Sequence, residues 1–266
     1  MDNLRIVPGS DYPGEGVSHG LARGLLVFYG DCNLTGEGMG IGTIALRDRT
    51  TTYFSRSRKD ATDENGVFTS TFTLDTRMTW IIRGKPSPLL TRWIEYGIST
   101  YMRHPRVQSL VMLPVPPLRS LLNIRPLFET IPSLGSVTFT YRIAGLSVTI
   151  EVHFNLTAQA PMTVCILNEL SGSWFTAGWD GEHVTSPPPG WEKITHMPVS
   201  VVDPTHRIRF FLNQPSVSPP YTLYRGREQT GDACWAGFCI ELDFKDGSRK
   251  LHDLQYSVGF TTGDIP

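Results

Sequence analysis

The sequence lacks the marks of a nucleic-acid-binding or membrane-spanning protein. Its 24 Lys and Arg residues are matched by 25 Asp and Glu, which gives a formal net charge of -1. Nucleic-acid-binding domains usually carry a clear basic excess, so we expect no nucleic-acid partner. No apolar run approaches the ~18 residues of a spanning helix. The first residues, MDNLRIVPGS, have neither the basic nor the apolar region of a secretory signal, which favours a cytoplasmic location.

Cysteine and the common catalytic motifs are also scarce. Four cysteines in 266 residues are too few for a disulfide scaffold, and we interpret them as small buried apolar side chains. No two of the seven histidines lie two or four residues apart, so no local metal-binding pair exists. The Gly-x-Ser-x-Gly and His-Glu-x-x-His motifs are absent. The sequence therefore predicts no metal and no cofactor.

Turn residues and aromatic residues are plentiful by contrast. The chain has 25 Gly and 20 Pro, and 11% of it is aromatic. Short Thr-rich and aromatic segments separated by Gly and Pro are typical of a β-sandwich or a β-barrel. We predict an all-β, mainly antiparallel fold of one of these two kinds. It is built either as one compact domain or as two packed, lipocalin-like halves, residues 1–157 and 158–266.

One segment departs from the β pattern. Ser87-Pro88 is a typical helix start, and the apolar residues after it recur at helical spacing until His104-Pro105. We predict one main helix over Pro88–Arg103, covering a sheet face or a barrel end.

A hairpin is predicted over Val137–Asn155, with Ala144-Gly145 as its turn. One face of this hairpin is apolar and contains Tyr141, a candidate ligand-binding residue. Glu151 and His153 lie on the other face and point the same way. A carboxylate beside an imidazole is suited to general acid–base catalysis if that face lines a cavity, and we take the pair as candidate catalytic residues. If the face meets solvent, the pair is ordinary surface.

Four glycines alternate with other residues between Tyr29 and Leu46, at positions 36, 38, 40 and 42. Their spacing does not fit the dinucleotide-binding fingerprint. We predict instead a strand with one bare face, packed closely against the helix or another strand, or forming the floor of a ligand site. Glu37 and Met39 point away from the bare face and are candidate ligand-binding residues.

Tryptophans gather in the segment SGSWFTAGWDGEHVTSPPPGW. Aromatic residues on polar loops can stack on sugars or cover an apolar cavity. They can equally fold inward as a small satellite core. Trp174, Trp179 and Asp180 are the candidate ligand-binding residues here.

Two functions are compatible with these features. We expect first a protein that encloses an apolar small molecule in a β-lined cavity, as a binder or as a cofactor-free isomerase, cyclase or hydratase. Such catalysis needs few donors and no conspicuous triad. The alternative is a carbohydrate-binding or carbohydrate-acting β-sandwich, with Trp174 and Trp179 as platforms and Asp180 and Glu182 as carboxylates. A partner-binding protein without a small ligand is the third reading.

Overall fold

The computed structural model describes residues 4–11, 20–48, 51–65, 67–94, 121–157, 161–181, 183–185, 190–213, 215, 221–230, 233–244 and 253–263. The strands are β1 (Leu4–Pro8), β2 (Leu25–Tyr29), β3 (Cys32–Asn33), β4 (Gly40–Arg47), β5 (Thr52–Thr62), β6 (Phe68–Ile82), β7 (Lys85–Pro86), β8 (Arg125–Thr130), β9 (Gly135–Ala144), β10 (Ser147–Leu156), β11 (Met162–Ser171), β12 (Ala177–Trp179), β13 (Val184–Thr185), β14 (Gly190–Lys193), β15 (Ser200–Asp203), β16 (Ile208–Asn213), β17 (Tyr221–Thr230), β18 (Ala233–Phe244) and β19 (Leu254–Thr262). A short 3-10 helix, η1 (Gly9–Asp11), follows β1, and residues 88–94 are α-helical.

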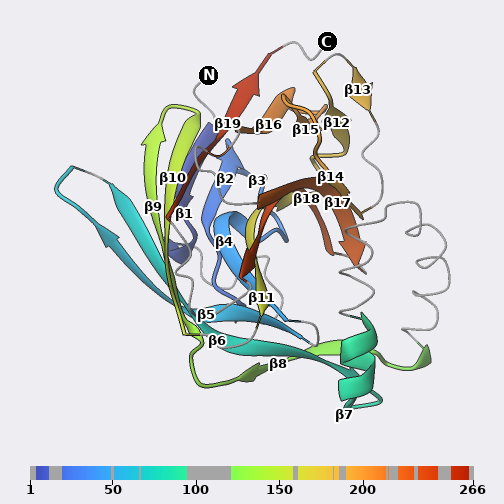
Figure 1. Cartoon of the computed structure of the whole chain (residues 1–266). Helices are drawn as coiled ribbons and strands as arrows, with labels where there is room; N and C mark the ends of the chain where they lie inside the picture. Colours follow the sequence, from blue (N-terminus) through green and yellow to red (C-terminus); the bar gives the residue numbers. More distant parts are fainter. Residues whose placement is uncertain are drawn as a thin grey trace.

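The strands form two arms that meet at the long β5–β6 pair (Figure 1). One arm runs β6–β9–β10–β19–β16–β15–β12–β13, and the other runs β5–β4–β11–β18–β17–β14. The strand pairings along both arms are antiparallel, and the sheet is not closed. The predicted all-β, mainly antiparallel class is confirmed.

One hydrophobic core lies between the arms. Strands from residues 1–157 pair with strands from residues 158–266 at β4–β11 and at β10–β19. The largest buried side chains come from both arms, among them Phe72, Phe139, Phe210 and Phe238. Hydrogen bonds also link the arms inside this core, since the Tyr256 hydroxyl of β19 lies 3.0 Å from Oδ1 of Asn168 on β11.

The β9–β10 hairpin is confirmed, although its predicted pairs are displaced by two residues. Ala144 pairs with Ser147 and Tyr141 with Ile150, so the turn is Gly145-Leu146. Gly145 has a φ of 60°, which suits the first central position of a tight hairpin turn. Because side chains alternate with a period of two, this shift keeps the predicted apolar face buried and the predicted polar face outside.

The glycine-rich stretch packs closely, as predicted, but against strands and not against the helix. Strand β4 begins only at Gly40, and Gly40 and Gly42 have φ values of 83° and 73°, so the stretch is not one extended strand with a bare face. A Cβ on Gly40 would lie 2.6 Å from the carbonyl oxygen of Leu25, and one on Gly42 would lie 2.7 Å from the Tyr141 ring. Glycine is needed at both positions, because residues with a side chain rarely adopt such φ values and because no space remains for a Cβ atom.

The predicted helix starts where expected. Ser87 precedes the helical residues 88–94, and its Oγ accepts a bond from the backbone N–H of Leu90 at 3.3 Å. The helix is bound to β6, where the backbone N–H of Trp80 donates to Oγ1 of Thr91 at 2.9 Å. The rest of the predicted helix, 95–103, lies outside the described residues.

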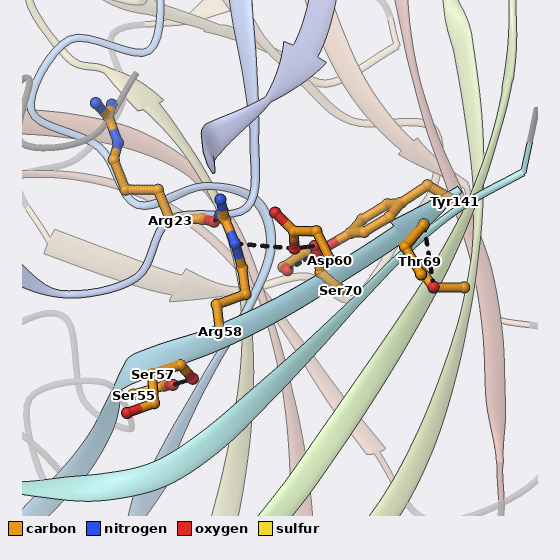
Figure 2. A network of polar contacts seen from close by, with 10 residues as sticks. Arg23, Ser55, Ser57, Arg58, Asp60, Thr69, Ser70 and Tyr141 are labelled. Atoms are coloured by element: carbon orange, nitrogen blue, oxygen red, sulfur yellow. Dashed lines mark hydrogen bonds and ion pairs between the residues drawn. The ribbon is translucent and has the colours of Figure 1, made fainter. Parts of the chain in front are cut away.

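Polar contacts tie the projecting β5–β6 hairpin to the body (Figure 2). The Arg58 guanidinium donates to the carbonyl oxygen of Arg23, and its Nε lies 3.0 Å from Oδ1 of Asp60. The same Oδ1 accepts from the Ser70 hydroxyl at 2.6 Å. The guanidinium carbon also lies 6.0 Å from the centroid of the Phe72 ring. These groups satisfy one another, so we interpret the network as a structural tie.

Candidate functional site

The polar face of the β9–β10 hairpin looks outward. Glu151 forms an ion pair with Arg142, and Nδ1 of His153 lies 2.7 Å from Oδ1 of Asp253. All four side chains are well exposed. Water therefore reaches both candidate catalytic groups, and the arrangement offers no closed cavity in which they would act together.

The candidates near the glycine stretch occupy three different settings. Glu37 is exposed, and Met39 is half-buried, with its backbone N–H donating to Oε2 of Glu169 at 3.3 Å. Tyr141 is buried in the core, where its hydroxyl donates to the carbonyl oxygen of Gly42 at 2.7 Å. Burial raises the pKa of this phenol well above its ordinary value, so Tyr141 stays neutral.

The tryptophan segment is divided between core and surface. Trp191 is buried in a satellite cluster with Cys165 and Cys239, whereas the guanidinium of Arg209 lies 4.9 Å above the ring of Trp179. Asp180 is exposed and accepts a bond from the backbone N–H of His183 at 2.8 Å. Glu182 lies outside the described residues.

None of the four cysteines, all of which lie in the described residues, forms a disulfide. Cys165, Cys234 and Cys239 are buried, as predicted, while Cys32 is partly exposed. Burial and, to a lesser extent, the charge of Asp203 raise the pKa of the Cys32 thiol. The thiol is therefore protonated at neutral pH, and Asp203 lies close enough for its charge to act on it.

Trp174, the remaining candidate, belongs to a group of side chains from three separate segments. Its ring centroid lies 5.0 Å from that of His206, and the Tyr29 ring lies 5.1 Å from the same imidazole. Asp203 binds the imidazole and acts on the thiol of Cys32. We call these five residues the His206 cluster.

The Asp203 carboxylate binds the imidazole of His206 and the backbone of the same turn. Asp203 is fully buried, and its Oδ1 accepts from the backbone N–H of Thr205 at 2.9 Å and of His206 at 3.1 Å. Its Oδ2 lies 2.6 Å from Nδ1 of the imidazole. A buried carboxylate bound to Nδ1 fixes the orientation of the ring, and Nε2 is then the ring nitrogen left for contact with another molecule.

Sequence reasoning identified Trp174 but missed Asp203 and His206. Asp203 is the last residue of β15 and His206 lies in the turn that follows, and an Asp at the start of such a turn commonly binds backbone N–H groups. The available signal was the i,i+3 spacing of a carboxylate and an imidazole between two apolar strands. Searching only for pairs of histidines passes over that signal.

A hollow of about 440 Å³ lies beside the end of β14 and the start of β17. Its apolar lining is Ile194, Met197, Tyr221 and Leu223, and its polar lining is Lys193, Thr195, His196 and Thr222. Small-molecule sites of this size commonly combine apolar walls with a few polar groups.

Within the part of the chain that the structure describes, no group of three or more His, Cys, Asp and Glu side chains is placed to hold a metal ion. None of the described helices is long and apolar enough to cross a membrane. Comparison with protein-family models, with curated proteins and with solved structures found no match.

Proposed function

We propose that this protein binds a small, largely apolar molecule beside the His206 cluster and that His206 acts on it as a general base. The reaction class is that of a cofactor-independent isomerase, cyclase or hydratase, in a cytoplasmic setting. The observation that carries the proposal is the 2.6 Å contact between Nδ1 of His206 and the fully buried Asp203, at an imidazole whose ring neighbours are Tyr29 and Trp174.

The surroundings of the imidazole favour this chemistry. A general base needs a neutral nitrogen within reach of the substrate and a group that stabilises the positive charge it gains. Nε2 would take the proton from the substrate or from an attacking water, and Asp203 would stabilise the resulting imidazolium. The rings of Tyr29 and Trp174 provide apolar surface, which favours a ligand with a flat or extended apolar body.

The hollow beside the end of β14 and the start of β17 is a second place for a ligand of the same class. Its apolar lining suits an apolar body, and Lys193 and His196 suit an acceptor or acidic group on that body. Binding there without binding at His206 supports a carrier rather than an enzyme.

The carbohydrate alternative has weaker support. Arg209 stacks on the ring of Trp179, which occupies one face of the platform that a sugar would need. Trp174 faces His206 edge-on, and Asp180 is engaged with the backbone of His183. We retain this alternative only as an outcome of the binding test.

A thermal-shift screen tests the proposal with polycyclic and polyene compounds beside a panel of oligosaccharides. A ligand at ~100 times its dissociation constant should add about 2.7 kcal/mol to the free energy of unfolding. The key variant is His206→Asn, because an Asn side chain can still donate to Asp203 but has no counterpart of Nε2. His153→Asn is the matched control.

We expect an apolar compound to stabilise the wild type and the control but to lose at least about tenfold in affinity for His206→Asn. Met197→Arg, which fills the hollow, separates the two places. Binding lost only in Met197→Arg contradicts a ligand at His206. Saturable binding of sugars alone contradicts the apolar ligand class. No stabilisation by any compound of either panel favours a protein without a small ligand.

A further inference from the structure

Three large apolar side chains project into solvent at one corner of the molecule. Leu89, Trp93 and Leu121 are 68%, 66% and 77% exposed. The corner consists of the end of β6, β7, the helical residues 88–94 and residues 121–125 before and at the start of β8. Figure 1 places β7 and these helical residues at the end of the molecule opposite the chain termini.

Leu90, Thr91 and Ile94 form the inward side of the helix, and Leu89, Arg92 and Trp93 lie on the outer side. Thr91 is buried, and its Oγ1 accepts from the backbone N–H of Trp80 and donates to the carbonyl oxygen of Ser87. Leu89 and Trp93 are four residues apart, so they share the outer face of the helix. Leu90 and Ile94 are the apolar residues that this helix turns toward the sheet, so Leu89 and Trp93 are additional apolar side chains on its outer face. Together with Leu121 they form a group of exposed apolar side chains, which favours a surface for interaction.

Residues 121–125 are bonded to the end of β6 and to the turn that leads into this helix. The backbone N–H of Arg83 donates to the carbonyl oxygen of Leu122 at 3.2 Å, and Ile81 pairs with Arg125 across β6 and β8. The β6–β7 turn that leads into the helix is formed by the pairing of Ile82 with Lys85. The apolar side chains thus stand on segments that are bonded together.

The charge of this corner differs in sign from that of the whole chain. Residues 81–94 and 121–125 contain Arg83, Lys85, Arg92 and Arg125 and no Asp or Glu, whereas the chain has a formal net charge of -1. All four basic residues are exposed. The corner therefore combines protruding Leu and Trp side chains with basic side chains that no carboxylate of these segments neutralises.

We propose that this corner docks the protein on the surface of an anionic lipid bilayer. The Trp93 ring and the Leu side chains would enter the headgroup and upper acyl region, while the four basic side chains would contact lipid phosphates. Apolar and basic side chains interleaved on one short face suit a membrane interface. This contact is peripheral, and it stands on observations separate from the His206 cluster.

Vesicle co-sedimentation tests the proposal directly with the full chain. The probes are vesicles of phosphatidylcholine with phosphatidylserine and vesicles of phosphatidylcholine alone. One variant is Leu89→Ser/Trp93→Ser, and a second is Arg83→Gln/Lys85→Gln/Arg92→Gln. Ile143→Ser removes an exposed apolar side chain from the β9–β10 hairpin and is the matched control. Circular dichroism and thermal melting check that every variant is folded.

We expect binding to the anionic vesicles, with a loss of at least about tenfold in the partition coefficient for either corner variant and no change for Ile143→Ser. The tryptophan emission of the wild type should shift to shorter wavelength with anionic vesicles, and Trp93→Phe should reduce that shift. Absence of binding, equal binding to neutral vesicles, or binding unchanged in both variants overturns the proposal. Self-association that the corner variants abolish, without vesicle binding, overturns it in favour of a second copy of the chain.

Discussion

Two histidine–aspartate pairs in this molecule have nearly the same geometry and very different surroundings. Nδ1 of His153 lies 2.7 Å from Asp253, and Nδ1 of His206 lies 2.6 Å from Asp203. In the first pair the side chains are 65% and 68% exposed, whereas in the second they are 20% and 0% exposed.

The contrast shows that contact distance alone does not identify a chemical site. Water and salt screen the pair at His153, where bulk solvent competes for each hydrogen bond. At His206 the carboxylate is removed from water and bound by three donors, and aromatic rings flank the imidazole. The sequence pattern favoured His153 with Glu151 as its carboxylate, whereas the inner pair is the one whose surroundings suit a general base.

Removing each carboxylate in turn should give the largest difference between the pairs. Asp203→Ala leaves two backbone N–H groups and the imidazole without their acceptor, so we expect a loss of about 3 kcal/mol in the free energy of unfolding. Asp253→Ala should cost less than about 0.5 kcal/mol. Urea denaturation measures both. Equal losses would mean that the two pairs are energetically alike.

Removing an aromatic ring beside His206 should make the chemical reactivity of the two histidines more alike. In the wild type, diethyl pyrocarbonate should modify His153 several times faster than His206 because the latter is shielded. Trp174→Ala removes one shielding ring and should raise the His206 rate toward that of His153. Peptide mass spectrometry follows each site separately. An unchanged His206 rate would show that Trp174 does not shield the imidazole.

The thiol of Cys32 reports on the charge of Asp203. A raised pKa means less thiolate at a given pH, so Cys32 should react with iodoacetamide more slowly at pH 8 than an ordinary exposed thiol. Asp203→Asn removes the charge but keeps an acceptor oxygen, and we expect a few-fold faster reaction, read by peptide mass spectrometry. A slower reaction in the variant would contradict this electrostatic coupling.

A phenol–carboxylate pair gives the smallest effect and a different pH range. The Tyr53 hydroxyl donates to Oδ2 of Asp48 at 2.9 Å, and burial, this bond and the Asp48 charge raise the pKa of Tyr53 to about 12 from an ordinary value of 10. The folded state therefore holds the proton more tightly than the unfolded state. The contribution of Tyr53 to the free energy of unfolding is therefore fully present below about pH 10 and is lost as the pH rises toward about 12.

Tyr53→Phe should flatten part of this alkaline loss. Denaturant unfolding at several values between pH 9 and about 12 measures it, and Asp253→Ala should leave the same range unchanged. A wild-type slope in Tyr53→Phe would assign the alkaline loss to other groups.

The sequence predicted the fold where the signal is local. Alternation along β9 and β10 identified the correct faces, and Ser87-Pro88 identified the helix start. The hairpin register was wrong by two residues because Gly145 occupies the first central position of the turn, and either placement buries the same face.

The site was harder to predict because its residues are brought together only by the fold. Tyr29, Trp174 and His206 are far apart in the sequence, and the residues around each of them do not indicate that the Tyr29 and Trp174 rings contact the imidazole. The prediction for the glycine stretch was wrong for a related reason, because period-two spacing suggests an extended strand. In the structure Gly40 and Gly42 adopt positive φ values and lie against Leu25 and Tyr141.

Under the proposed function, His206 and not His153 contacts the ligand. A nitrogen–proton correlation spectrum of the imidazoles, recorded while the apolar compound found by thermal shift is titrated in, tests it most directly. We expect a saturable shift of the His206 Nε2 signal, with the signals of His153 unchanged. A ligand that binds while the His206 signals stay in place, or that shifts both histidines alike, would contradict it.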